Sequence, residues 1–198
     1  MQLTYEEGKM NVPLTRNSKI LKKEMSALLI IDIQEKILPA MFAPELVLDN
    51  TLKLVKGFKV LNVPVFYTEQ YPKGLGPTSA KLLEELQGLS GIPKMTFSCF
   101  GADNLFERLA DNKIKQVVIA GIELHVCVQQ TALDLLANNF QVNIPADAVS
   151  SRRELDYNVG LQRLLKHGAE ITTTESVLFE LLGSCGTDEF RTISKLIK

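Results

Sequence analysis

The chain has 198 residues and a formal net charge of −1, and it is long enough for one domain with a substantial core. Hydrophobic residues make up 45% and charged residues 23% of the chain, a balance that excludes intrinsic disorder. The small net charge argues against a non-specific nucleic-acid binder, which normally carries a strong basic excess.

Cysteine usage and the N-terminal residues set expectations for the cellular compartment. The chain has three cysteines, an odd number, and no Cys-x-x-Cys pair, which predicts free thiols. The first 25 residues have no apolar region like that of a secretory signal, and no apolar stretch is long enough to span a membrane. We therefore expect a soluble intracellular protein in the cytoplasm, with a mitochondrial association as the alternative.

Apolar runs of strand length alternate with segments of helical periodicity along most of the chain. In chain order, the pattern predicts a strand at 26–34, a helix at 44–61, a strand at 63–70, an irregular loop at 71–77, a helix at 79–86, a short strand at 92–95, a helix at 102–111, a strand at 115–121, a helix at 126–140, a strand at 141–144, a helix at 154–167, a strand at 169–173 and a helix ending near residue 182. This alternation predicts an α/β fold with a doubly wound, mostly parallel six-stranded sheet and helices on both faces. Residues 1–25 are a predicted N-terminal arm outside the core, and residues 26–198 a single domain.

Polar residues at the carboxyl ends of the predicted strands are the candidates for a ligand site, because open parallel sheets bind ligands there. Asp32 lies in the apolar run LLIIDIQ, where a buried carboxylate is either paired or functional. The alternative is that Asp32 caps the following helix. Lys94 lies among apolar residues in IPKMTF and needs an anionic partner there, unless its stem extends to solvent.

Cys127 is the candidate nucleophile. It follows a predicted strand at the first turn of a helix, where backbone N–H groups and the helix dipole favour a thiolate. The alternative is an inert buried cysteine. Cys99, between aromatic residues, is expected to pack in the core, and Cys185 has no evident partner.

Several other chemistries lack their motifs. His125 and Cys127 have only His167 as a further histidine, which is too few ligands for a closed zinc site. No Gly-x-Ser-x-Gly elbow of a serine hydrolase occurs, and KGLGPT fits neither glycine-rich phosphate-binding pattern. We therefore expect neither a metal nor a cofactor.

Taken together, four segments resemble the isochorismatase-like cysteine hydrolases, namely LLIIDIQ, PKMTFSCF, VVIAGIELHVCVQQTALDLL and ADAVSSR. A fifth segment, YTEQYPKGLGPT, resembles the eukaryotic isochorismatase domain-containing proteins more than the nicotinamidases, and the resemblance runs from about residue 27 to residue 182. It implies a Rossmann-like three-layer sandwich in which Asp32, Lys94 and Cys127 meet in one pocket. It also implies a cis peptide between Ile122 and Glu123, and an oxyanion hole formed by the backbone N–H groups of Glu123 and Cys127.

Three departures from relatives narrow the expected activity. The segment EQYPKGLG lacks the histidines of metal-dependent nicotinamidases, and Cys127 is a residue that true isochorismatases generally lack. Leu124 stands where several relatives have threonine, which makes the pocket wall more apolar. The resemblance thus implies a metal-free hydrolase that attacks a small amide or related C–N bond through a covalent thioester.

The expected substrate is a small molecule, and the family resemblance implies a homo-oligomer with no nucleic-acid or membrane partner. Three alternatives stay open: a catalytically silent binding or scaffold protein, a ribonuclease, and a thiol-based redox role for Cys127. The expected substrate contacts are two polar and three apolar side chains, namely Gln34, Gln70, Phe42, Phe100 and Leu124.

Overall fold

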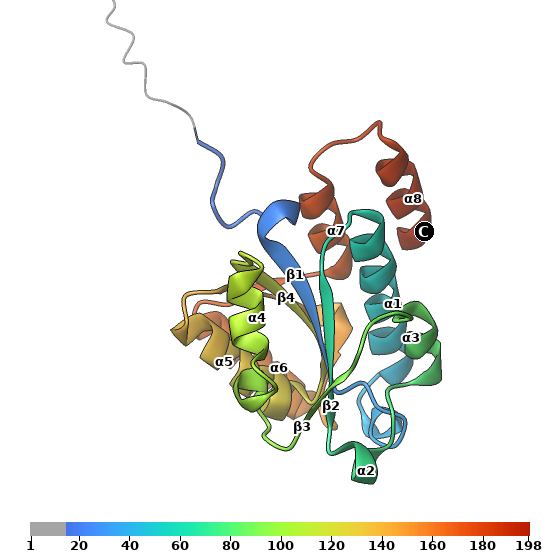
Figure 1. Cartoon of the computed structure of the whole chain (residues 1–198), viewed down its shortest axis with the longest axis vertical. Helices are drawn as coiled ribbons and strands as arrows, with labels where there is room; N and C mark the ends of the chain where they lie inside the picture. Colours follow the sequence, from blue (N-terminus) through green and yellow to red (C-terminus); the bar gives the residue numbers. More distant parts are fainter. Residues whose placement is uncertain (1–14) are drawn as a thin grey trace, which may run out of the picture.

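The computed structural model describes residues 15–198 and has one parallel sheet between two layers of helices (Figure 1). The strands are β1 (Ser26–Ile31), β2 (Val65–Gln70), β3 (Ile92–Lys94), β4 (Gln116–Ile122), β5 (Gln141–Pro145), β6 (Val149–Ser150) and β7 (Glu170–Thr172). The helices are α1 (Pro44–Val60), α2 (Pro72–Leu75), α3 (Ala80–Glu85), α4 (Leu105–Asp111), α5 (Gln129–Ala137), α6 (Glu154–Lys166), α7 (Thr174–Leu182) and α8 (Asp188–Ile197). No helix in this part of the chain is both long and apolar enough to cross a bilayer.

The predicted α/β fold is confirmed, with one correction to the number of strands. The described residues contain seven strands where the sequence pattern predicts six, because β6 pairs with the end of β4 over only two residues. A strand of two residues is too short to leave a periodic pattern.

The order of the strands places the reversal point of the sheet between β1 and β4. Along the sheet the order is β3-β2-β1-β4-β5-β7, and all paired strands are parallel. The chain thus moves outward from β1 through β2 to β3, and then continues from the other side of β1 with β4. In such sheets a crevice opens beyond the carboxyl ends of the two strands at the reversal.

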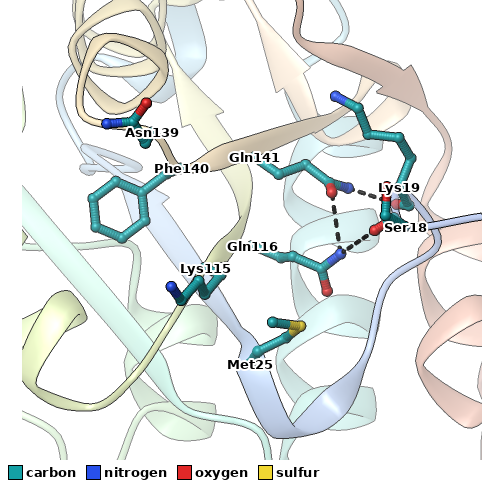
Figure 2. Close-up of a pocket in the computed structure, with 8 residues that line it drawn as sticks. All are labelled: Ser18, Lys19, Met25, Lys115, Gln116, Asn139, Phe140 and Gln141. Atoms are coloured by element: carbon teal, nitrogen blue, oxygen red, sulfur yellow. Dashed lines mark hydrogen bonds between the residues drawn. The ribbon is translucent and has the colours of Figure 1, made fainter.

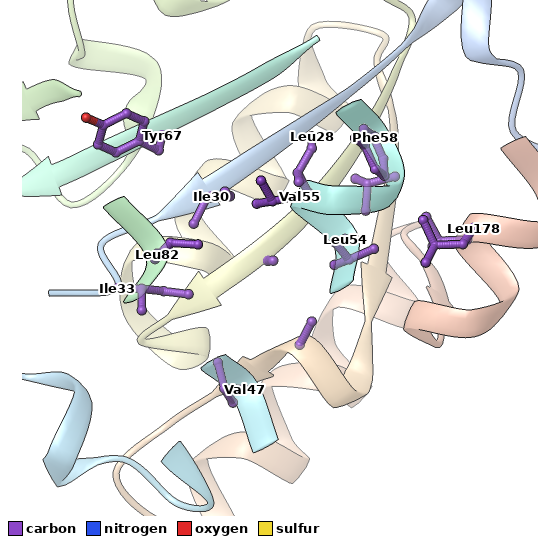
Figure 3. Packing of buried hydrophobic residues seen from close by; sticks show 14 of the residues in the cluster. Leu28, Ile30, Ile33, Val47, Leu54, Val55, Phe58, Tyr67, Leu82 and Leu178 are labelled. Carbon is purple, nitrogen blue, oxygen red and sulfur yellow. The ribbon is translucent and has the colours of Figure 1, made fainter. Parts of the chain in front are cut away.

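The sheet divides the core into two hydrophobic clusters, because successive side chains of a strand point to opposite faces. Leu28 and Ile30 of β1 pack in the cluster with α1, α3, α7 and α8, where Phe58 and Leu178 are fully buried (Figure 3). Leu29 and its alternate neighbours pack in the second cluster with α4, α5 and α6. Every residue of β1 is buried, as the continuous apolar run predicts for a central strand.

The segment before β1 is bound to the amino end of the sheet, so the predicted boundary of the core at residue 26 needs correction. Leu21 is 3% exposed and belongs to the first cluster. The side-chain amide of Gln116 donates to the carbonyl of Ser18 and to the side-chain oxygen of Gln141 (Figure 2). The side-chain amide of Gln141 donates in turn to the carbonyl of Lys19. These bonds join the predicted arm to β4 and β5, a position that sequence periodicity alone could not predict. Residues 1–14 of the arm lie outside the described part.

At Gly121, β4 comes so close to β1 that no space is left for a side chain. It pairs with Ile31 in the register of the two strands and has a φ of +139°. A Cβ atom at Gly121 would lie 2.3 Å from the carbonyl oxygen of Ile31, so the site requires glycine for its backbone angle and for space.

We expect Gly121→Ala to lower the free energy of unfolding by about 3 kcal/mol or more, from the positive φ and the backbone clash together. Gly88→Ala is the matched control, because Gly88 also has a positive φ but a Cβ there would meet no atom within 4 Å. The control should lose only about 1 kcal/mol in urea unfolding. Equal losses for the two variants would contradict the tight contact between β1 and β4.

Candidate active site

Asp32 and Cys127 line one cavity of about 170 Å³ beyond the carboxyl ends of β1 and β4. Asp32 follows β1 directly, and Cys127 lies in a π-helical turn, Leu124–Val128, that follows β4. The other polar side chains of the lining are Gln70, Glu123 and Arg152. The cavity therefore lies at the reversal point of the sheet, where the topology predicts a ligand site.

Asp32 ends β1 by taking a left-handed backbone conformation, with a φ of +56°. The strand predicted over 26–34 is therefore three residues shorter in the structure. Aspartate tolerates this conformation better than most residues, and such angles cluster at functional sites. The side chain of Asp32 is 4% exposed, and its Oδ1 accepts a hydrogen bond of 2.8 Å from the hydroxyl of Thr68 on β2.

Lys94 reaches Asp32 from the far side of β2. Its Nζ lies 2.7 Å from Asp32 Oδ2, and its side chain is fully buried. The same ammonium donates to Gln70 Oε1 at 2.6 Å and to the carbonyl of Phe97 at 3.0 Å. A buried ion pair persists only when further hydrogen bonds offset the loss of water, and β2 supplies a partner to each member of this pair.

The environment of Cys127 differs from the expectation drawn from its place at a helix start. Burial, reinforced by the negative charge of Asp32, raises the pKa of the Cys127 thiol to about 12, although Lys94 acts in the opposite direction. Cys127 is thus a neutral thiol that lines the same cavity as Asp32. Burial also raises the pKa of Asp32, so the carboxylate is a stronger base than a solvent-exposed one.

Glu123 lies between β4 and the turn that bears Cys127. The peptide bond between Ile122 and Glu123 is cis. The Glu123 carboxylate makes a two-point contact with Arg152, with Nε to Oε1 at 2.6 Å and Nη2 to Oε2 at 3.2 Å. Sequence reasoning included Arg152 only as the last residue of ADAVSSR and assigned it no role, because nothing local indicates a partner 29 residues away.

Of the five predicted substrate contacts, only Gln70 lines this cavity, and its amide already bonds to Lys94 and to the carbonyl of Met95. Gln34 is fully buried and uses its amide on the backbone of Gln70 and Gly76, so it fixes the loop after β2. The other three predicted contacts are apolar.

Phe42, Phe100 and Leu124 lie outside the cavity lining. Phe42 is 44% exposed and contacts the ring of Tyr157, while Phe100 is 58% exposed and packs edge-on against Phe106. Leu124 is completely buried against Gly160. Each of these side chains packs against a residue of a helix, and sequence spacing does not show that these helices lie nearby.

In residues 15–198, no three or more His, Cys, Asp or Glu side chains converge as the ligands of a metal ion would. His125 Nδ1 lies 2.9 Å from the hydroxyl of Ser151.

We expect Thr68→Val to destabilise the fold increasingly as the pH rises. The buried carboxyl of Asp32 has a raised pKa, so its ionisation costs stability above the pKa of the unfolded chain, and the loss of the Thr68 hydroxyl raises this pKa further. The variant should lose about 1 kcal/mol near pH 4, where less of Asp32 is ionised, and about 2–3 kcal/mol near pH 8.

Thr51→Val is the matched control, because the Thr51 hydroxyl is buried without a hydrogen-bond partner in the described structure. Its urea midpoint should stay the same or increase at both pH values. A deficit of Thr68→Val that does not change with pH would show that Thr68 does not stabilise the ionised form of Asp32.

Comparisons with known proteins identify a family for this chain. The isochorismatase domain family matches residues 26–176. Isochorismatase domain-containing protein 2 of Danio rerio is 40% identical over 172 residues, which cover 87% of this chain and 86% of the relative. Isochorismatase domain-containing protein 2A of Mus musculus is 36% identical over 178 residues, which cover 88% of this chain and 84% of the relative.

A solved structure shows the same fold at a similar level of identity. The MAR1 ribonuclease of Caenorhabditis elegans has a TM-score of 0.84 at 34% identity, over 89% of this chain and 91% of that chain. The domain match and these identities over most of both chains agree with the motifs from which the sequence resemblance was drawn. The chain belongs to the isochorismatase family.

Proposed function

We propose that the protein is a cysteine hydrolase that cleaves a small-molecule amide or related C–N bond through a covalent thioester. Membership in the isochorismatase family supports hydrolase activity in general. The observation that carries the finer proposal is one buried carboxylate, Asp32, which pairs with the Lys94 ammonium and lines the same cavity as the Cys127 thiol.

The first half of the proposed reaction forms the thioester. Cys127 is a neutral thiol at rest, so it needs a base, and Asp32 is the carboxylate whose negative charge acts on the thiol. As the sulfur attacks the amide carbonyl carbon, Asp32 takes the thiol proton and Lys94 stabilises the negative charge. Asp32 then gives the proton to the nitrogen, the C–N bond breaks, and ammonia or an amine leaves.

The backbone N–H groups of Glu123 and Cys127 are the proposed donors to the oxyanion of the tetrahedral intermediate. Preorganised donors of this kind contribute about 3 kcal/mol each to the stability of the transition state. In the second half, Asp32 takes a proton from water, the hydroxide attacks the thioester carbon, and the acid product and the Cys127 thiol are released.

Cys127→Ala is expected to reduce amide turnover by about 10⁴-fold or more, and Asp32→Asn by at least about 10²-fold, because the first removes the nucleophile and the second its base. Ammonia release from a panel of small amides measures this. The matched control is Cys185→Ala, since Cys185 is exposed and should leave turnover unchanged.

Three results would refute this assignment in different ways. Undiminished turnover in Cys127→Ala would exclude covalent catalysis. If the panel is not hydrolysed at all while small amides still bind, a catalytically silent binding protein is the better interpretation. Reversible oxidation of Cys127 without hydrolysis would indicate a redox role instead.

A ribonuclease is the second candidate, and the observation that favours it is the name of the 34% identical Caenorhabditis elegans structure. The net charge of −1 and the lack of a converging carboxylate cluster in residues 15–198 oppose it. We expect any RNA cleavage by the wild-type preparation to persist in Asp32→Asn and Cys127→Ala, as contamination would. Loss of cleavage in both variants would establish the ribonuclease activity.

We also propose that the chain forms a homo-oligomer. The loop after β3 exposes three large apolar side chains, with Met95, Phe97 and Phe100 at 71%, 55% and 58% exposure. Clusters of this kind are common at protein interfaces. Sedimentation velocity should give a mass of at least twice the 22.0 kDa of one chain, and a monomer at micromolar concentration would contradict the proposal.

A further inference from the structure

The cavity beside Cys127 has apolar walls and two ion pairs. Five of its lining residues are apolar, namely Ile37, Leu75, Phe97, Ile122 and Val126. The charged lining residues are Asp32, Glu123 and Arg152, and Lys94 lies directly behind Asp32. The two carboxylates and two cations at the cavity thus form two ion pairs, and their charges sum to zero.

The second pair, Glu123 and Arg152, is unequal in its exposure to solvent. The side chain of Glu123 is 10% exposed and that of Arg152 is 61% exposed. Arg152 contacts the carboxylate at two points, with N···O distances of 2.6 and 3.2 Å, so much of its fork of N–H groups is already used. The proposed mechanism does not use either charge, since only the backbone N–H of Glu123 takes part in it.

A ligand that enters this cavity loses water and meets no uncompensated charge. An ionised group on the ligand would therefore be buried without a partner, which is costly, or would have to displace one member of an existing pair. A neutral ligand has no such cost, and the five apolar side chains favour an aliphatic group.

The size of the cavity limits the ligand as well. A cavity of about 150 Å³ in another protein admits benzene, a molecule of six heavy atoms. The 170 Å³ cavity is therefore suited to an amide of roughly six to eight heavy atoms.

We propose that the Glu123–Arg152 pair is a specificity determinant that keeps the cavity neutral and selects uncharged amides with a short aliphatic acyl group. This substrate class rests on the proposed amide hydrolase function. The role of the pair in excluding charged molecules does not depend on turnover, because it concerns access to Cys127.

The test compares two alkylating probes that differ in charge, iodoacetamide and iodoacetate, on the full chain at pH 7.5. In each reaction the Cys127 sulfur bonds to the methylene carbon, iodide leaves, and the thiol proton is lost to Asp32 or water. The ratio of the two rates cancels the fraction of thiolate, because both probes react with the same thiol. Cys185 is exposed and provides the reference ratio within the same sample by peptide mass spectrometry.

In the wild-type protein, the preference for iodoacetamide over iodoacetate at Cys127 should exceed that at Cys185 by about tenfold or more. Glu123→Gln removes the negative charge and leaves Arg152 uncompensated, so this preference should fall by about tenfold. Arg152→Gln breaks the same contact but leaves the carboxylate, so the preference should stay the same or increase.

Three outcomes would overturn the proposal: a wild-type preference no greater at Cys127 than at Cys185, no fall in Glu123→Gln, or equal falls in both variants. Equal falls would mean that breaking the contact merely opens the cavity. Turnover separates this inference from the proposed function, using valeramide and succinamate as neutral and anionic substrates of similar length. Hydrolysis of both at similar kcat/KM would refute the substrate class alone, whereas selective labelling without hydrolysis of either would refute the hydrolase assignment alone.

Discussion

The buried ion pair between Asp32 and Lys94 is the constraint on which the arrangement of the site depends. Two opposite charges 2.7 Å apart, with side-chain exposures of 4% and 0%, are stable only if the protein replaces the water that they lose. The pair spans β2, because Asp32 follows β1 and Lys94 ends β3. The side chains of Thr68 and Gln70 on β2 therefore lie between them, and each bonds to one member.

The same burial determines how Cys127 can act. A helix start favours a thiolate through its dipole, yet the local loss of water outweighs this effect and raises the pKa of the thiol. The same cause raises the pKa of the Asp32 carboxyl, which makes this group better able to accept the thiol proton. In the proposed mechanism, the thiol is activated only when a substrate brings its carbonyl carbon to the sulfur.

The second ion pair completes the electrostatic balance of the cavity. Glu123 is anchored by Arg152, and its backbone joins β4 to the turn that bears Cys127. Breaking this contact by removing the cation would leave a carboxylate nearly buried and unpaired. The pair is thus linked both to the position of the turn and to the charge that an entering ligand encounters.

The sequence alone determined the fold class and the family, and it proposed the three principal site residues. The apolar runs of β1 and β4 indicate buried central strands. Asp32 and Cys127 follow these strands, and parallel strands end at the same edge of the sheet, so the sequence predicts that the two residues lie at one edge. Periodicity is a local property, so it also placed most helices and strands within a few residues of their bounds.

Tertiary structure decided which side chains meet. Thr68 and Arg152 became partners of Asp32 and Glu123 only through the strand order and the loop after β6. The predicted contacts Gln34, Phe42, Phe100 and Leu124 are instead committed to backbone amides or apolar neighbours. The pKa of Cys127 likewise depends on burial by distant segments. These outcomes depend on contacts between residues far apart in the chain and on the exclusion of water, and neither is encoded in the spacing of residues along one element.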